Sequence, residues 1–178
     1  MALKPTIYKF DIAISDLDRN VFENIALTVA QHPSESTERM MARVLAFCLH
    51  TQDNLTFTKG LSAADEPDIA MYSLSGENLL WIDVGEPAVE RIKKATRASK
   101  TVYIYSFNSK SDVWWSQSRN KFAQLNVAVR QFKWPEIQML ASKIERTMNM
   151  SVTLTEDSAY FATNNGECEL SILSLQTL

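Results

Sequence analysis

Two aspartates, Asp68 and Asp83, stand in a stretch whose alternation would bury both of them. The stretch runs from Glu66 to Pro87, "EPDIAMYSLSGENLLWIDVGEP", and is typical of two apolar strands joined by a tight turn. If Ser75-Gly76 is a two-residue turn, facing residues have numbers that add to 151, so Asp68 faces Asp83. With Gly76-Glu77 as the turn, the aspartates lie one pair apart on the same face, whereas a three-residue turn would separate them.

Carboxylates in this arrangement can bind a divalent cation. Two like charges that lie roughly 4.5 to 8 Å apart on neighbouring strands repel each other, so a compensating positive group is expected. Mg²⁺ or Mn²⁺ suits the site, because such a hard cation is held by one or two carboxylates together with water and phosphate oxygens. The alternative is that one aspartate lies at a frayed strand end and that neither does chemistry.

A third carboxylate comes from the helix expected after "HPSESTERMM". Glu38 is four residues before Ala42 and seven before Leu45, so it flanks the buried face of this helix, whereas Glu35 points farther toward water. Glu38 is therefore a candidate third ligand of the cation. An acid near a helix N-terminus also has an ordinary explanation, because it interacts favourably with the helix dipole.

Alternating patterns along the chain indicate the elements that position these side chains. The order of strands and helices predicts one domain over residues 1–178, with a mixed α/β sheet layered with helices. We expect a hairpin of strands at 8–14 and 21–29, helices at 34–50, 87–99, 112–124 and 135–148, and further strands at 55–58, 100–107, 126–132, 151–155, 159–163 and 169–173. The nearly all-apolar strand at 100–107 is expected to be covered on both faces.

Charge is divided unevenly along the chain. The net charge is −3, but the segment from Ala88 to Lys133 carries +8, so the remainder carries −11. A basic segment of this kind is typical either of contacts with nucleic-acid phosphates or of solvated helix faces. Trp114 and Trp115 are either base-stacking or core residues. The candidate phosphate contacts are Arg91, Arg97, Lys100, Lys110, Arg119 and Lys121.

Several classes of protein are disfavoured. The N-terminus lacks the apolar core of a signal peptide, and nowhere do about 18 apolar residues run together. The two cysteines lack CxxC spacing, which argues against a disulfide framework or a zinc site. His32 and His50 have no nucleophile partner, which argues against Ser-His or Cys-His catalysis. We therefore expect a cytoplasmic protein with no membrane contact, and we favour a monomer.

The order of these motifs resembles the core of the PD-(D/E)XK nuclease superfamily, in which a helix with an inward Glu precedes an acidic strand hairpin, a basic helix and a strand. "EPD" at 66–68 and "WIDVG" at 81–85 are similar to its two motifs. Across nearly the whole chain, "MALKPTIYKF", "HPSESTERMM", "FTKGLSAADEP" and "LWIDVGEPAVERIKKA" resemble the YaeQ family. The resemblance implies a restriction-endonuclease-like core, here with an extra N-terminal hairpin and extra C-terminal strands.

The resemblance also implies roles for particular residues. Asp68 and Asp83 would be the two acids of the motifs, and Glu38 would join them at a metal. Gly85 stands where the motif has its lysine. In the superfamily that lysine can move to the following helix, where "ERIKKA" offers Lys93 as the better geometric candidate, with Lys94 in reserve and Arg91 also near the buried face.

The implied function is cleavage of nucleic acid by a phosphodiesterase that depends on Mg²⁺ or Mn²⁺. The alternative is a catalytically inactive module that binds nucleic acid or protein on the same fold. Gly85 favours the module, whereas the retained acids and the nearby lysines favour the enzyme.

Overall fold

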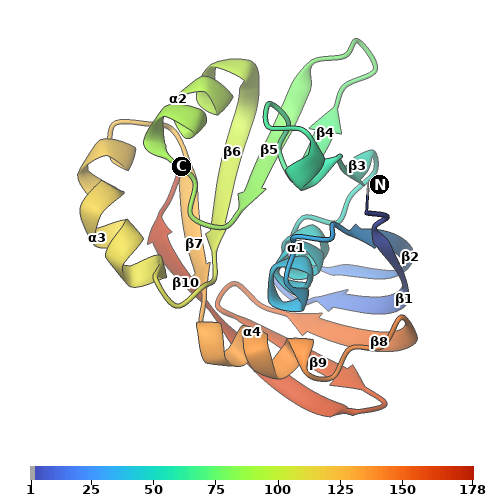
Figure 1. Ribbon diagram of the computed structural model, residues 1–178. Helices are drawn as coiled ribbons and strands as arrows, with labels where there is room; N and C mark the ends of the chain where they lie inside the picture. The colour runs from blue at the N-terminus through green and yellow to red at the C-terminus, as the bar shows by residue number, and fades with distance from the viewer. Residues whose placement is uncertain (1–2) are drawn as a thin grey trace.

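A ten-stranded mixed sheet curls around one buried helix, α1, in the computed structural model, which describes residues 3–178 (Figure 1). The strands follow the order β2-β1-β8-β9-β10-β7-β6-β5-β4-β3. The strands are β1 (Thr6–Asp16), β2 (Val21–Gln31), β3 (Leu55–Phe57), β4 (Ile69–Tyr72), β5 (Asn78–Val84), β6 (Ser99–Ser106), β7 (Ala128–Phe132), β8 (Thr147–Leu154), β9 (Ser158–Thr163) and β10 (Gly166–Gln176). The helices are α1 (Thr37–Leu49), α2 (Val89–Ala98), α3 (Ser111–Phe122) and α4 (Trp134–Ala141), with a 3-10 turn, η1, at Gly60–Ser62.

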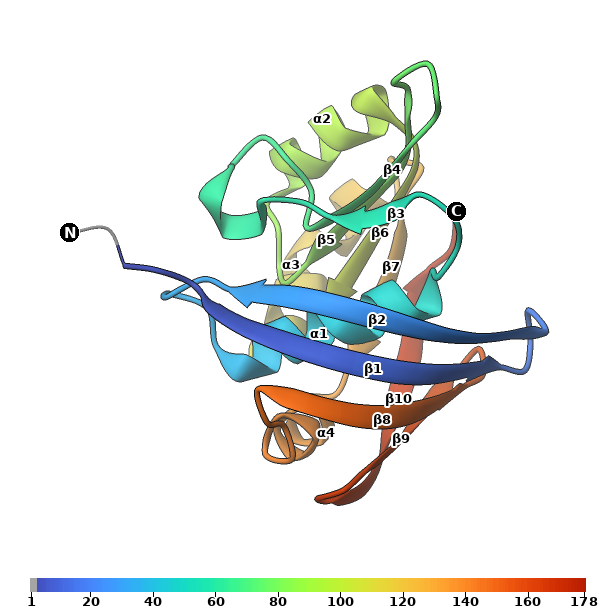
Figure 2. The ribbon, with the colours of Figure 1, turned by 90° about the vertical axis from the view of Figure 1, so that its right-hand side faces the viewer.

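Strand β10 joins the two halves of the sheet. Residues 166–171 pair with β9, and from Ile172 onward the same strand pairs with β7. Its register shifts between Ser174 and Gln176, and such a shift bends a strand and increases its twist. The long hairpin of β1 and β2 therefore lies across from β3, β4 and β5, with α1 between them (Figure 2).

Helix α1 is buried because the curled sheet covers it on several sides. Every residue from Met40 to Leu49 is buried, including Arg43, and a helix that is apolar nearly all round belongs in a core. Its N-terminal cap is Ser36, whose side chain accepts a hydrogen bond from the Arg39 N–H, so the helix begins later than the predicted Ser34. At the other end, Arg19 donates to the Thr51 carbonyl, as a cation near a helix C-terminus should.

The remaining helices cover the sheet from both sides. Helices α2 and α3 pack on the outer face, where Val102 and Ile104 of β6 meet them, while Tyr105 of the same strand faces α1. This confirms that the strand predicted at 100–107 is covered on both faces. Within residues 3–178, no helix is long and apolar enough to cross a membrane.

Two sequence-based element predictions were wrong. The helix predicted at 135–148 ends at Ala141, because the strand period resumes at Thr147 and buries Met148 and Met150 on one side of β8. The turn between β4 and β5 is also longer than two residues, because residues 73–77 form the loop. A register shift between Met71 and Tyr72 compensates, so the facing residues near the aspartates still add to 151.

The buried side chain of His50 makes the free energy of unfolding sensitive to pH. The His50 Nε2 atom lies 2.6 Å from the hydroxyl of Tyr105, which is fully buried. Burial, together with the nearby charges of Arg130 and Arg19, lowers the pKa of His50 to about 3. His50 therefore gains a proton near pH 6.5 in the unfolded chain but stays neutral at that pH in the folded protein. The free energy of unfolding therefore decreases as the pH falls below 6.5.

We expect the wild type to lose up to about 1.4 kcal/mol per pH unit from this source between pH 6.5 and pH 5. His50→Gln removes the titrating ring while keeping a group that can hydrogen-bond to Tyr105. Urea unfolding at both pH values should therefore show a weaker pH dependence for this variant, and His32→Gln is the matched control. Equal pH dependence in the wild type and His50→Gln would refute this explanation.

Candidate functional site

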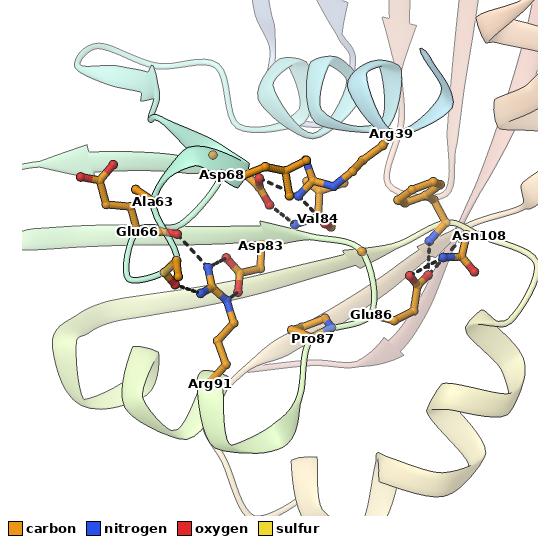
Figure 3. A pocket seen from close by; sticks show the side chains of 15 residues that line it. Arg39, Ala63, Glu66, Asp68, Asp83, Val84, Glu86, Pro87, Arg91 and Asn108 are labelled. Carbon is orange, nitrogen blue, oxygen red and sulfur yellow. Dashed lines mark hydrogen bonds and ion pairs between the residues drawn. The ribbon is translucent and has the colours of Figure 1, made fainter. Parts of the chain in front are cut away.

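A pocket of about 470 Å³ lies where the end of β5 meets the first turns of α1 and α2. Asp68 and Asp83 both line it, together with Arg39, Arg91 and Glu86 (Figure 3). The two aspartates that the register prediction paired are thus brought to one pocket. Each carboxylate, however, already has an arginine as its partner.

Asp68 immediately precedes β4 and is held from both sides. Its carboxylate accepts hydrogen bonds from the Val84 N–H at 2.8 Å and from Arg39 Nη2 at 2.8 Å. The same Nη2 atom donates to the Val84 carbonyl at 3.1 Å, and Arg39 Nη1 donates to Glu35 at 2.9 Å. Arg39 therefore connects α1 to β5 and to the start of β4 through two acceptors, and to the segment before α1 through a third.

Asp83 lies near the end of β5 and is 3% exposed. Its Oδ1 atom accepts a hydrogen bond from Trp81 Nε1 at 3.0 Å. Arg91 donates to both carboxylate oxygens, with Nε 2.6 Å from Oδ2 and Nη2 3.1 Å from Oδ1. Burial raises the pKa of the Asp83 carboxyl above its ordinary value, and the hydrogen bond from Arg91 opposes that rise. The hydrogen bond to Asp83 in turn raises the pKa of Arg91.

Arg91 also fastens the segment that leads into β4. Its guanidinium donates to the carbonyls of Ala64 and Glu66, the second at 2.7 Å, and lies 5.6 Å from the centre of the Trp81 ring. This position follows from the helix start. Since α2 begins at Val89, Arg91 lies in its first turn, beside the end of β5.

The two glutamates before and in α1 take opposite places from those predicted. Glu35 is buried and accepts from Arg43 Nε and Nη2, each at 2.7 Å, as well as from Arg39. Glu38 is partly exposed and does not line the pocket. The later cap at Ser36 leaves Glu35 outside the helix, in the segment that precedes α1.

The lysines of α2 also lie elsewhere. Lys93 and Lys94 are exposed and do not line the pocket, so Arg91 is the basic residue that α2 contributes to the pocket. Trp114 and Trp115 pack against Phe122 and are partly buried, which favours their interpretation as core residues. The other candidate phosphate contacts are exposed on or beside α2 and α3, namely Arg97, Lys100, Lys110, Arg119 and Lys121.

Sequence reasoning missed Glu86, a further carboxylate at the pocket. It accepts hydrogen bonds from the Phe107 and Asn108 N–H groups, each at 3.1 Å, from Asn108 Nδ2 at 2.7 Å and from Ser111 Oγ at 2.6 Å. It thereby fixes the loop between β6 and α3 and the side chain of the first residue of α3. No local sequence pattern signals these contacts, because Glu86 is more than 20 residues away from its partners.

The donors at the pocket fit a divalent cation only in part. Asp68, Asp83 and the Val84 carbonyl offer the hard oxygen ligands that Mg²⁺ prefers. Among the described residues, no group of three His, Cys, Asp or Glu side chains is arranged to hold a metal. The protein thus supplies two carboxylates, and water or substrate oxygens would have to complete the shell.

We expect Asp83→Asn to raise the melting temperature at pH 7 in a chelating buffer. Because burial raises the pKa of Asp83, folding disfavours its charged form, and the amide keeps an acceptor for Trp81. A gain of about 1 kcal/mol corresponds to roughly 2 to 4 °C for a chain of this size. The gain should shrink as the pH falls through the raised pKa of the folded protein, and it should vanish below 3.8, the ordinary value, where the carboxyl is protonated in both states.

The exposed Asp53→Asn is the control and should leave the melting temperature unchanged. If Asp83→Asn instead melts well below the wild type, the ion pair with Arg91 contributes more to stability than the burial of the charge removes.

Comparisons with known proteins agree over nearly the whole chain. "Uncharacterized protein YaeQ" of Salmonella typhi is 40% identical over 175 residues, covering 96% of this chain and 97% of the relative. Its namesake from Escherichia coli K12 is 35% identical over 178 residues, covering 99% and 98%.

Two crystal structures are similar to this one. YaeQ protein from Xanthomonas axonopodis pv. citri superposes with a TM-score of 0.94 at 32% identity, covering 98% of this chain and 99% of that one. YaeQ protein from Pseudomonas syringae gives 0.92 at 31% identity, covering 98% and 97%. The family model described as "YaeQ protein" matches residues 1–172. The chain therefore belongs to the YaeQ family.

Proposed function

We propose that this protein is a phosphodiesterase that cleaves nucleic acid with the help of a divalent cation. The observation that carries the proposal is the meeting of Asp68 and Asp83 in one open pocket, beside the Val84 carbonyl and the guanidinium of Arg91. The order of elements gives further support. Helix α1, the hairpin of β4 and β5, helix α2 and strand β6 follow one another as in a PD-(D/E)XK core.

The residues have distinct tasks in this proposal. Asp68, Asp83 and the Val84 carbonyl would hold Mg²⁺ or Mn²⁺. When bound, the cation lowers the pKa of a water molecule and offsets charge on the phosphate. Arg91 replaces the missing motif lysine as the positive group, and its planar guanidinium suits two phosphate oxygens at once. Because a guanidinium stays protonated, Arg91 stabilises charge and does not act as a base.

A second candidate function is an inactive binding or regulatory module. Gly85 at the lysine position and the arginine on each carboxylate favour it, because both are compatible with a pocket that has lost catalysis. The exposed bases along α2 and α3 serve either function, since phosphate contacts do not require cleavage.

Cleavage of labelled single- and double-stranded oligonucleotides tests the first function. We expect the wild type to cut at least one of them in Mg²⁺ or Mn²⁺ and not in chelator. Asp68→Asn and Asp83→Asn should each lower the rate by at least about 100-fold, because each removes a cation ligand. Asp53→Asn should cut at the wild-type rate. Absence of cleavage by the wild type under all these conditions would favour the module.

The basic segment predicts salt-sensitive binding of nucleic acid. If the wild type binds through Lys93 and Lys94, the double reversal to Glu should weaken binding and lower the slope of log affinity against log salt by about 2. Fluorescence anisotropy at several salt concentrations measures both quantities. The exposed Lys4 and Lys9, reversed in the same way, provide the matched control on the N-terminal segment. An unchanged slope after reversal of Lys93 and Lys94 would show that they do not contact phosphates.

A further inference from the structure

We infer that the pocket binds a divalent cation and a phosphate diester together, and that Arg91 passes from Asp83 to the phosphate when they bind. This inference rests on the proposed function and concerns how the cation and the phosphate affect each other's binding at the same site. The starting observation is that Arg91 and a cation need the same carboxylate oxygens. Both oxygens of Asp83 already accept hydrogen bonds from Arg91.

Arg91 is placed to exchange partners. Its side chain is 33% exposed, whereas that of Asp83 is 4% exposed, so the arginine lies at the rim and the carboxylate beneath it. The carbonyls of Ala64 and Glu66 also hold the guanidinium. If a cation takes Asp83, these carbonyls keep Arg91 at the pocket with its charge uncompensated, which is the condition for binding an anion (Figure 3).

Arg39 differs from Arg91 in this respect. Arg39 retains Glu35 as a charged partner when Asp68 binds a cation, and the side chain of Arg39 is 17% exposed. Glu35 is fixed in turn by two hydrogen bonds from Arg43. Of the two arginines at the pocket, Arg91 is therefore the one that loses its carboxylate partner, Asp83, and becomes free for a phosphate.

The ligand count points the same way. Two carboxylates and a carbonyl leave several positions of a Mg²⁺ shell open, and phosphate oxygens are its usual further ligands in proteins. The pocket is lined by two arginines and four carboxylates, so its formal charge of −2 attracts a divalent cation and repels a free anion. Each ligand thus improves the site for the other, which is positive coupling between their affinities.

Titration calorimetry with Mg²⁺ tests this coupling, with and without dimethyl phosphate as a diester too stable to be consumed. Sodium chloride at equal ionic strength replaces the diester in the reference. We expect the diester to raise the Mg²⁺ affinity of the wild type by about fivefold or more. In Arg91→Gln the carboxylate is free of its guanidinium. This variant should therefore bind Mg²⁺ more tightly than the wild type without diester, and the diester should add little.

Arg146→Gln is the matched control, because Arg146 is an exposed arginine that does not line the pocket and is not a candidate phosphate contact, and it should behave as the wild type. Melting curves in chelator establish that each variant is folded. If the wild type and Arg91→Gln bind Mg²⁺ equally well and neither responds to the diester, the exchange is refuted while the cation site stands.

Coupling that survives in Arg91→Gln also refutes the exchange, because another group must then receive the phosphate. If no variant binds Mg²⁺ with or without diester, the cation site itself is absent. The proposed function then falls together with this inference.

Discussion

The arginines of α1 connect the two halves of the curled sheet. Arg43 donates to the Ala30 carbonyl of β2 and to Glu35, and Arg39 donates to Glu35, to Asp68 and to the Val84 carbonyl of β5. The hairpin of β1 and β2 and the hairpin of β4 and β5 are therefore connected through one turn of α1. Removing one partner of a buried ion pair leaves an uncompensated charge, at a cost of about 3 to 5 kcal/mol. The position of Asp68 thus depends on a contact that also closes the fold around α1.

Asp68 and Asp83 therefore differ in how firmly the surrounding residues hold them. Asp68 is part of a network of two carboxylates and two arginines that is nearly closed to solvent, and the Val84 N–H gives it a further donor. Asp83 has a single arginine at the rim, together with the Trp81 N–H. The like charges that the hairpin brings together are compensated within the chain by one arginine each, Arg39 from the buried network and Arg91 from the rim.

Much of this arrangement could be read from the sequence, and the failures have local causes. The aspartates were expected on one face, and both line the pocket; the neighbouring pairs of β4 and β5 keep the expected sum of 151 even though the loop between the strands is longer than predicted. Glu35 was expected to point toward water because it was placed inside the helix, whereas the cap at Ser36 leaves it in the preceding segment, where it pairs with Arg39 and Arg43. The side chains of Arg39 and Glu86 meet distant backbone groups, for which no local pattern exists.

The replacement of the motif lysine illustrates how a fold constrains the chemistry left to its site. Gly85 has a φ of 125°, a backbone conformation that L side chains rarely adopt, so a lysine at this position would strain the chain where it leaves β5. The positive group therefore has to come from another element, and the first turn of α2 is the nearest that points back to the strand end. At that turn stands an arginine, which cannot give up its proton but can grip two oxygens. In the function proposed above, a carboxylate and a phosphate would therefore compete for one guanidinium, because Asp83 and a phosphate both offer such a pair of oxygens.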